Sequence, residues 1–393
     1  MQPPEHLAYT PDQRALRAEL RSYFAALVTE EVRRDLRLAD TATQTARTLH
    51  LKLGADGWLG VGWPRQYGGR GLTPVEQFVF FDEAARAGCP LPLVALNTVG
   101  PTLMRFGTQE QKDLLLPGIL SGEIDVAAGY SEPGAGTDLA SLATRAVRTE
   151  DGSAYVVNGQ KIFTTHGDSA EYVWLACRTD QDAPKHKGIS ILLVDTRDPG
   201  FEATKIHTIA SHYTTATYYR DVRVPVTMRV GAENEGWKLI TSQLNHERVM
   251  LGPAGRIAGL YERVAEWAAR PAADGRRPLD EPDVRRALGE VRAIARINEL
   301  LNWQVAAREG DVDVADASAT KVFASERAQH VFRLLEEVVG RHGDPADPET
   351  AHLMHWLDVQ AKRSLVITFG GGVNEVQREL IAQFGLNLPR VAR

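Results

Sequence analysis

The sequence predicts an α+β protein in three parts: an N-terminal helical domain, a middle antiparallel β domain and a C-terminal helical bundle. Apolar residues recur at helical spacing in the first and last parts, whereas the segment between them holds short runs of β-forming residues separated by turn pairs. The length of 393 residues also favours two or three domains. We place these domains at residues 1–125, 126–230 and 231–393.

Helix-capping patterns divide the first part into helices. Thr10-Pro-Asp-Gln13 combines a hydroxyl cap, a proline in the first turn and an amide three residues after the cap. Thr73-Pro-Val-Glu76 repeats this pattern, and Gly88 is a helix stop. Thr108, followed by Gln111, predicts a third helix start.

Turn pairs and β-forming runs mark the middle part. Asp151-Gly152 and Asn158-Gly159 predict hairpin turns, because both pairs favour positive φ. The predicted strands are Ala154 to Val157, Tyr172 to Ala176, Ile189 to Val194 and Thr217 to Val224.

The helical period returns after about residue 234. Two apolar stripes predict long helices that face a core; they consist of Val284, Leu288, Val291 and Ile294, and of Val331, Leu334 and Val338. Prolines separate the helical segments.

Composition excludes several classes of protein. The formal charge is −6 and Lys and Arg are scattered, so no basic stripe indicates nucleic-acid binding. Cys89 and Cys177 are too few for a disulfide framework or a zinc site. No apolar run approaches the ~18 residues of a membrane helix, and the polar start of the chain lacks a signal-peptide core. We therefore expect a cytoplasmic protein without a metal or a membrane partner.

Two polar, glycine-containing segments form the main candidate for a ligand site. Tyr130-Ser-Glu-Pro-Gly-Ala-Gly-Thr-Asp138 offers hydroxyls and an open backbone that a flat ligand can approach. About thirty residues later, Gly159-Gln-Lys-Ile-Phe-Thr-Thr165 adds an aromatic ring and further hydroxyls. The alternative for the first segment alone is a surface turn.

A carboxylate lies on an apolar helix face in the third part. Glu247 occupies the missing step of a stripe formed by Trp237, Ile240, Leu244 and Leu251. Burial raises the pKa of a carboxyl group, as a general base near neutral pH requires. The alternative is that Glu247 lies at the edge of the stripe and pairs with an arginine of a neighbouring helix.

The two glycine-containing segments resemble the flavin-binding signature of acyl-CoA dehydrogenases, and the resemblance covers nearly the whole chain. It implies the acyl-CoA dehydrogenase-like fold, FAD as cofactor, and an acyl-CoA thioester as substrate. By this resemblance the flavin-binding residues are Tyr130, Ser131, Gly136, Thr137, Phe163, Thr164 and Thr165, and Thr137 also lies near the pantetheine.

The resemblance also implies a base. In this family a glutamate removes the α-proton of the thioester while the β-hydrogen leaves as hydride. Most members carry that glutamate in a loop before the last helix, but a minority carry it on a helix, in a context similar to Asn245-His-Glu-Arg-Val249. Gly371 occupies the usual loop position here, so the resemblance assigns the base to Glu247.

The glycines at the loop position have a meaning of their own. By resemblance, Gly371 and Gly372 bind substrate, since a backbone N–H of this loop donates to the thioester carbonyl. The absence of side chains leaves room for a bulky acyl group. The alternative is a helix-entry loop that needs positive φ, and both can hold.

Two departures from the family pattern concern FAD. Homotetrameric members bind the diphosphate with an Arg-x-x-Phe-Gly motif, which is absent from Arg270-Pro-Ala-Ala-Asp-Gly-Arg-Arg-Pro-Leu-Asp280. A Gly-Gly-x-Gly segment for the adenine half is replaced by Val339-Gly-Arg-His-Gly-Asp-Pro345. Arg276 or Arg277 could substitute for the first motif, but neither is framed by it.

These departures predict a second, different subunit that supplies the missing FAD contacts. The pattern resembles subunits of heterotetrameric acyl-CoA dehydrogenases of actinobacterial steroid side-chain (cholesterol) degradation, with two copies of each subunit. It is most similar to the subunit type that acts on a pregnene-carboxyl-CoA ester, and an electron-transfer flavoprotein is the implied oxidant. Two alternatives stay open: a non-catalytic partner subunit, and a homotetramer acting on short branched acyl-CoAs.

Overall fold

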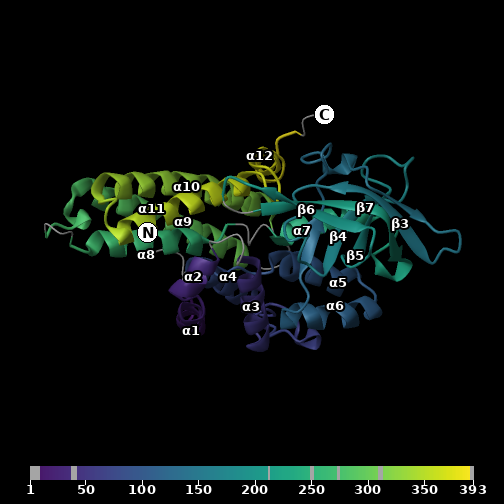
Figure 1. Ribbon diagram of the computed structural model, residues 1–393, viewed down its shortest axis with the longest axis horizontal. Coiled ribbons are helices and arrows are strands. Elements are labelled where there is room, and N and C mark those ends of the chain that lie inside the picture. The colour runs from purple at the N-terminus through teal and green to yellow at the C-terminus, as the bar shows by residue number, and fades with distance from the viewer. Residues whose placement is uncertain are drawn as a thin grey trace. The chain divides into compact units, whose positions relative to one another are not determined.

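The computed structural model describes residues 9–36, 42–210, 213–247, 252–271, 275–308 and 313–389 (Figure 1). The chain forms two compact units. The bundle unit comprises Met1–Arg34, Thr73–Pro90 and Arg248–Arg393, and the sheet unit comprises Asp35–Leu72 and Leu91–Glu247. The predicted order of helices, β sheet and helices is confirmed, whereas the domain boundaries near residues 125 and 230 stay predictions.

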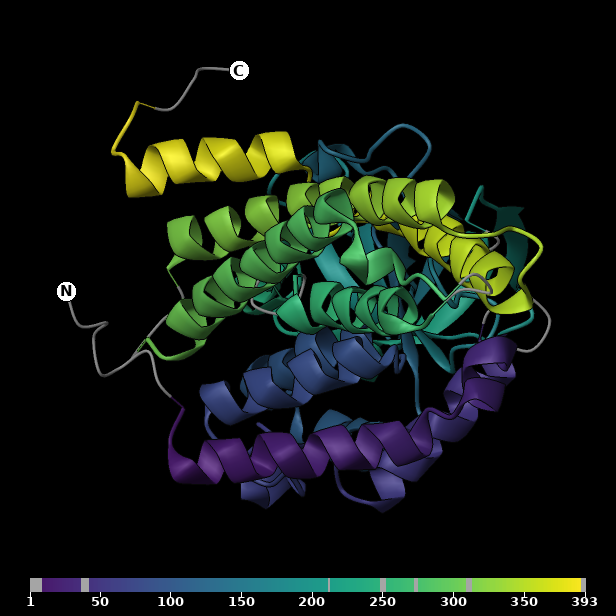
Figure 2. The same cartoon turned by 90° about the vertical axis from the view of Figure 1, so that its left-hand side faces the viewer.

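The bundle unit is helical (Figure 2). Its helices are α1 (Pro11–Leu27), α2 (Glu30–Asp35), α4 (Pro74–Ala87), α8 (Ala254–Ala269), α9 (Pro282–Ala306), α10 (Val314–His342), α11 (Pro348–Ser364) and α12 (Asn374–Leu380). Helix α4 packs against both α1 and α8, while α10 contacts α9, α11 and α12. Segments from both ends of the chain therefore share one helical unit.

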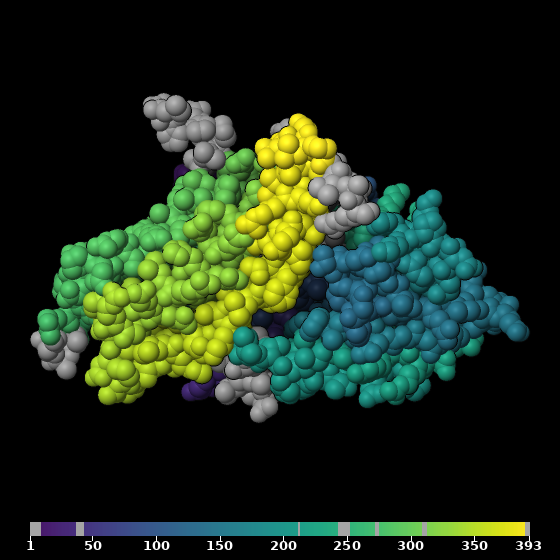
Figure 3. Space-filling model, turned by 90° about the horizontal axis from the view of Figure 1, so that it is seen from above, coloured from purple at the N-terminus to yellow at the C-terminus, as the bar shows by residue number. Residues whose placement is uncertain are grey.

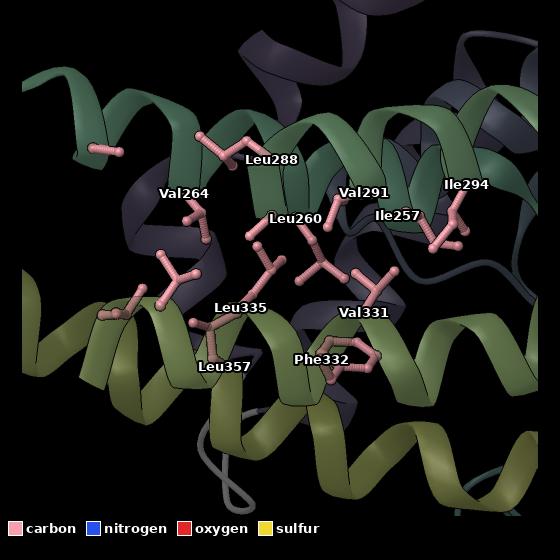
Figure 4. Packing of buried hydrophobic residues seen from close by; sticks show 14 of the residues in the cluster. Ile257, Leu260, Val264, Leu288, Val291, Ile294, Val331, Phe332, Leu335 and Leu357 are labelled. Atoms are coloured by element: carbon pink, nitrogen blue, oxygen red, sulfur yellow. The ribbon is translucent and has the colours of Figure 1, made fainter. Parts of the chain in front are cut away.

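The predicted apolar stripes form the core of this bundle (Figure 4). Val284, Leu288, Val291 and Ile294 on α9 are all buried. On α10, Val331 and Val338 are buried, and Leu334 packs against the same core from a partly buried position. The remaining core side chains come from α8 and α11 and from further positions on α9 and α10. The helical periodicity therefore identified the inward faces of the two longest helices correctly.

The three predicted helix starts are confirmed. Thr10, Thr73 and Thr108 each begin a helix with a reciprocal capping box, in which the third helical residue bonds back to the cap. Gly88 ends α4 in the left-handed conformation at a φ of 76°, as its position as a stop signal predicted.

The sheet unit combines helices with one eight-stranded sheet. Its helices are α3 (Ala42–Ala55), α5 (Gly100–Phe106), α6 (Gln109–Ser121) and α7 (Gly236–Glu247), and the π-helical segment η3 (Val94–Val99) precedes α5. The strands are β1 (Val126–Gly129), β2 (Arg145–Arg148), β3 (Ala154–Lys161), β4 (Tyr172–Arg178), β5 (Ile189–Asp195), β6 (Phe201–His207), β7 (Tyr213–Pro225) and β8 (Arg229–Val230).

The sheet is largely antiparallel, with the order β6-β7-β3-β2-β4-β5-β8, and β1 pairs with β4 in parallel. Strand β2 also makes one parallel pairing with β4. All four predicted strands exist, as β3, β4, β5 and β7, but the other four were not predicted. The missed strands have two to seven residues, and short runs give little periodic signal.

One predicted hairpin turn is correct and the other is wrong. Asp151-Gly152 lies in the turn between β2 and β3, where Gly152 has a φ of 68°. Asn158-Gly159 instead lies inside β3, at an irregularity in its pairing with β7. Asn158 exchanges hydrogen bonds with Asp221 of β7, and a Cβ on Gly159 would lie 2.6 Å from the Thr144 hydroxyl oxygen. Gly159 therefore lies at a β-bulge, where its lack of a side chain allows Thr144 to approach the backbone closely, and it does not form a turn.

Candidate active site

The two segments predicted to bind flavin, residues 130–138 and 159–165, lie side by side in the sheet unit. We call these two segments the flavin cradle. The Ile162 N–H donates to the Ser131 carbonyl over 2.8 Å, which joins the end of β3 to the loop that follows β1. That loop closes on itself through two hydrogen bonds between Glu132 and Ala135. Residues 130–138 and 159–165, about thirty apart in sequence, are thus brought together as the sequence predicted.

The exposed part of this cradle offers an aromatic ring, hydroxyls and bare backbone. Phe163 is 63% exposed although it is aromatic, and Thr137 and Thr165 are also exposed. A Cβ on Gly134 or Gly136 would meet no protein atom within 4 Å. The space over the glycines is open in the protein itself, so they leave room for a flat ligand and relieve no internal clash.

Two residues with an unusual backbone conformation lie at the end of the second segment. Phe163 and His166 have φ values of 60° and 65°, in the left-handed region that non-glycine residues rarely adopt. Such strain persists where surrounding contacts fix it, and it gathers at ligand sites. Here Thr164 is fixed by its neighbour Thr215, because its N–H donates to the Thr215 carbonyl and its carbonyl accepts from the Thr215 hydroxyl.

Tyr130 and Thr164 have more internal positions. The Tyr130 hydroxyl accepts a hydrogen bond from Nε1 of the buried Trp174 at 3.1 Å, which orients the tyrosine ring. Thr164 is fully buried, and its hydroxyl lies 3.4 Å from that of Thr217. The position of Thr164 therefore favours support of the segment over direct contact with a cofactor.

A buried ion pair beneath the cradle was not predicted. Lys161 is fully buried, and its Nζ donates to Glu132 Oε1 at 2.8 Å and to the Tyr130 carbonyl at 3.0 Å. The Glu132 carboxylate also accepts from the N–H groups of Ala143 and Thr144. Both ionised groups thus have hydrogen-bonding partners, and the pair fixes the start of the 130–138 segment to the end of β3.

The electrostatics of this pair follow from burial and pairing. Burial alone would raise the pKa of Glu132, but the Lys161 ammonium and the other donors outweigh it, so its pKa lies below the usual value. Burial lowers the pKa of Lys161, and Glu132 opposes that change. Both residues lie within the predicted motifs, but their pairing across 29 positions depends on the fold and left no signal in spacing.

The glycine loop between α11 and α12 belongs to the bundle unit. Gly371 and Gly372 have φ values of 68° and 97°, so the loop needs glycine for its backbone, as one of the two sequence interpretations stated. Among the residues that the structure describes, the N–H groups of Gly371 and Gly372 have no acceptor, whereas those of Phe369 and Gly370 donate to the Val366 carbonyl.

Glu247 is the last residue of α7, in the sheet unit. Its side chain, like those of Leu244 and Leu251, lies outside the described residues. Upstream on the predicted apolar face, Ile240 is fully buried and Trp237 is partly buried with its ring against His186.

The arginines near the missing diphosphate motif are occupied by local partners. Arg277 makes a two-point pair with Asp280, with N–O distances of 2.7 and 3.0 Å. In the segment that replaces the glycine-rich adenine site, Arg341 pairs with Asp283 and Glu337. That segment is helical as far as His342, the last residue of α10, instead of forming an open loop.

Comparison with known proteins identifies the family. Three family models match in chain order: the N-terminal domain of acyl-CoA dehydrogenase over residues 10–123, the middle domain over 127–222 and the C-terminal domain over 234–386. The chain belongs to the acyl-CoA dehydrogenase family. It is therefore an enzyme of a flavin-dependent oxidoreductase family, and members of that family bind FAD.

Several acyl-CoA dehydrogenases are similar over their full length. Acyl-CoA dehydrogenase FadE29 of Mycobacterium tuberculosis is 59% identical over 385 residues, covering 98% of this chain and 99% of the relative. A chain in the crystal structure of the ChsE4-ChsE5 complex from Mycobacterium tuberculosis is 48% identical, with a TM-score of 0.89 and coverage of 98% and 99%. A chain of the Tcur3481-Tcur3483 steroid ACAD is 47% identical, with a TM-score of 0.89 and coverage of 98% and 100%.

The cradle fits the isoalloxazine ring that acyl-CoA dehydrogenases bind, because it combines an exposed aromatic ring, exposed hydroxyls and unobstructed glycine backbone. Within the described ranges, no group of three His, Cys, Asp or Glu residues is arranged to hold a metal ion. None of the described helices is long and apolar enough to cross a membrane.

Proposed function

We propose that this acyl-CoA dehydrogenase is the base-bearing subunit of a heteromeric enzyme that introduces an α,β double bond into a steroid side-chain CoA ester. The observation that carries the proposal is the combination of an intact cradle in residues 130–138 and 159–165 with diphosphate and adenine segments that lack the family motifs. The cradle supports flavin chemistry in this chain, and the altered segments support a second chain that completes the site.

The reaction breaks two C–H bonds and forms one C=C bond. The Glu247 carboxylate accepts the α-proton, and the N–H donors of the glycine loop hold the thioester carbonyl oxygen, which gains negative charge as that proton leaves. FAD, when bound, supplies an acceptor for the β-hydride. Tyr130, Ser131, Gly136, Thr137, Phe163 and Thr165 bind and orient its ring, Thr164 supports them, and Thr137 also contacts the pantetheine. An electron-transfer flavoprotein then removes the electrons.

Charge also supports a second subunit. The FAD diphosphate requires cations or helix-end N–H groups. Asp280 already binds Arg277, and Asp283 and Glu337 already bind Arg341. Two similar structures carry the names of two different chains, the ChsE4-ChsE5 complex and the Tcur3481-Tcur3483 steroid ACAD. These names support a second, different subunit, and we propose two copies of each.

The acyl group is proposed from similarity and from space. One similar structure is named a steroid ACAD, and the glycine loop carries no side chain at Gly371 or Gly372. A bulky, rigid acyl group such as a pregnene-carboxyl ester needs that room. Short branched acyl-CoAs would not require it.

Glu247→Gln tests the assignment of the base. We expect the variant, co-expressed with its partner subunit, to assemble and keep FAD but to lose at least ~10³-fold in kcat on pregnene-carboxyl-CoA, since no other carboxylate is assigned the α-proton. Steady-state kinetics with an artificial electron acceptor measure this, and the flavin absorbance reports loading. Turnover equal to that of the wild type would show that Glu247 is not the base, and it would contradict a catalytic role for this chain.

A further inference from the structure

A buried lysine holds the glycine loop from behind. Lys321 lies on α10 and is only 2% exposed. Its Nζ donates to the Gly372 carbonyl at 2.6 Å, to the Asn374 Oδ1 at 2.7 Å and to the Thr368 carbonyl at 3.4 Å. All three N–H donors of the ammonium group are therefore directed to the loop, on both sides of Gly371.

Further hydrogen bonds between α10 and Asn374 fix this arrangement. The Asn374 amide nitrogen donates to the Ser325 hydroxyl at 3.0 Å and to Glu326 at 3.2 Å. Ser325 and Asn374 are themselves buried. Lys321, Ser325 and Glu326 all belong to α10, with Lys321 and Ser325 one turn apart on the same face. A rigid helix therefore defines the position of the loop.

The charge on Lys321 is not needed for packing alone. Within the part of the chain that the structure describes, no carboxylate lies within ion-pair distance of its Nζ, and burying a cation without a counter-ion is costly. A neutral donor would hydrogen-bond to the same acceptors with a smaller desolvation penalty. The ammonium group also places a positive charge beside the loop. Among the described residues, the Gly371 and Gly372 N–H groups of this loop have no acceptor.

We propose that Lys321 is a positioning residue for the dehydrogenation. It draws the loop carbonyls to itself, which leaves the N–H groups of Gly371 and Gly372 available to the thioester carbonyl, and its charge favours the negative charge that develops there. This inference rests on the proposed function, because it assigns Lys321 a role in holding the same thioester.

Protonation of Lys321 adds a pH dependence. Burial lowers its pKa to about 8, and Glu375 and Glu326 act in the opposite direction. Arg378 pairs with Glu326 at 2.6 Å. Well below pH 8 the ammonium form predominates, whereas well above it the neutral amine keeps two N–H donors but has lost its charge. We therefore expect kcat of the wild type to fall as pH rises through about 8.

Lys321→Met in the co-purified complex tests the inference. We expect kcat on pregnene-carboxyl-CoA to fall about 10- to 100-fold with little change in KM, because the transition state is affected more than ground-state binding. The variant should lack the alkaline decrease near pH 8. Hydrogen exchange followed by mass spectrometry should rise in residues 365–377 and stay unchanged in α9. Lys321→Gln, which keeps a neutral donor, is the second variant if the methionine variant does not fold.

Lys362→Met is the matched control. Lys362 is a partly exposed lysine of the same unit, and its Nζ pairs with Asp358 one helical turn away on α11. Its removal should leave kcat, the pH profile and loop exchange unchanged. A Lys321 variant with wild-type kcat and pH profile would overturn the inference, as would one whose whole bundle exchanges faster. A wild-type complex without activity on pregnene-carboxyl-CoA would instead contradict the proposed function, and this inference would fail with it.

Discussion

At the scale of single residues, a buried lysine supports each of two glycine-containing loops that the sequence predicts to bind ligands. Lys161 and Lys321 are each buried, and each donates to main-chain carbonyls of a glycine-containing loop. The first lies in the sheet unit under the flavin cradle and has a carboxylate partner, Glu132. The second lies in the bundle unit and has none at ion-pair distance among the described residues. Each loop thus depends on one lysine for its geometry.

Lys161→Met should weaken the flavin cradle. Removing the lysine leaves the Glu132 carboxylate buried without its ion-pair partner, which costs about 3–5 kcal/mol. We expect a lower free energy of unfolding and faster loss of FAD from the complex, measured by denaturant titration and by flavin fluorescence after dilution.

Lys185→Met is the control for this prediction. Lys185 pairs with Asp138 of the same loop at 2.6 Å, but both side chains are more than half exposed. Exposed pairs contribute little to stability, so this variant should keep its flavin and unfold like the wild type. Equal effects of the two substitutions would contradict a special role for Lys161.

Asp82 predicts a pH dependence of stability. It is buried on α4 and accepts from the Gly255 N–H at 2.6 Å, and burial raises its pKa from 3.8 to about 6 despite the nearby Arg17. The folded protein therefore holds this proton more tightly than the unfolded chain. The stability contributed by Asp82 is complete below pH 4 and decreases as pH rises to about 6.

Asp82→Asn isolates this contribution. The amide oxygen can still accept from Gly255, while the charge never forms. We expect the free energy of unfolding of the variant, relative to the wild type, to rise by up to about 3 kcal/mol between pH 4 and pH 7. Urea titrations at several pH values measure it. A constant difference across this range would show that the raised pKa of Asp82 is wrong.

At the scale of helices, glycines allow α4 and α8 to approach closely. A Cβ on Gly255 would lie 1.8 Å from the Asp82 carbonyl oxygen, and one on Gly259 would lie 2.4 Å from that of Arg86. Both contacts are with backbone, which cannot move aside as a flexible side chain can. The two glycines on one face of α8 therefore fix its distance from α4.

Gly255→Ala should separate these helices and destabilise the bundle unit by about 3 kcal/mol. Gly289→Ala is the matched control, because Gly289 lies inside α9 with nothing within 4 Å of its Cβ position. That change should stabilise the protein by about 0.5–1 kcal/mol through helix propensity. Thermal unfolding of both variants gives the comparison, and a stable Gly255→Ala protein would contradict the close approach.

At the scale of the whole molecule, apolar side chains gather near the C-terminus. The exposed large hydrophobic residues of the last part are Leu365, Val366, Phe369, Phe384, Leu386 and Leu388. Several of them follow α12, whose segment lies on the surface of the bundle unit (Figure 3). So many exposed apolar residues near one end of the sequence agree with a segment that binds another protein.

The chain expressed alone should be poorly soluble and carry little FAD, whereas co-expression with its partner subunit should give a soluble yellow complex. Phe384→Ser with Leu388→Ser should improve the solubility of the lone chain. Sedimentation and the ratio of flavin to protein absorbance measure this. A yellow, active homotetramer from the lone chain would contradict the proposed heteromeric assembly.

Local interactions made much of the fold predictable. The capping boxes at Thr10, Thr73 and Thr108 involve residues three apart. The apolar stripe of α9 follows the helical repeat, so both features can be recognised from residues close together in the sequence. The sequence also predicted the glycine-containing loops, and the structure forms a loop at each of these places, whereas their roles in ligand binding stay predictions. The short strands were missed since their pairing depends on distant neighbours.

The sequence by itself determined the family, the order of helical and β parts, and the two glycine-containing loops. Only the tertiary structure decided that Gly159 serves a β-bulge, that Lys161 reaches Glu132, and that Lys321 holds the loop at Gly371 and Gly372. The physical reason is range. Caps and periodic faces arise within one or two helical turns, whereas burial of a charge and its partners depend on which distant segments the fold brings together.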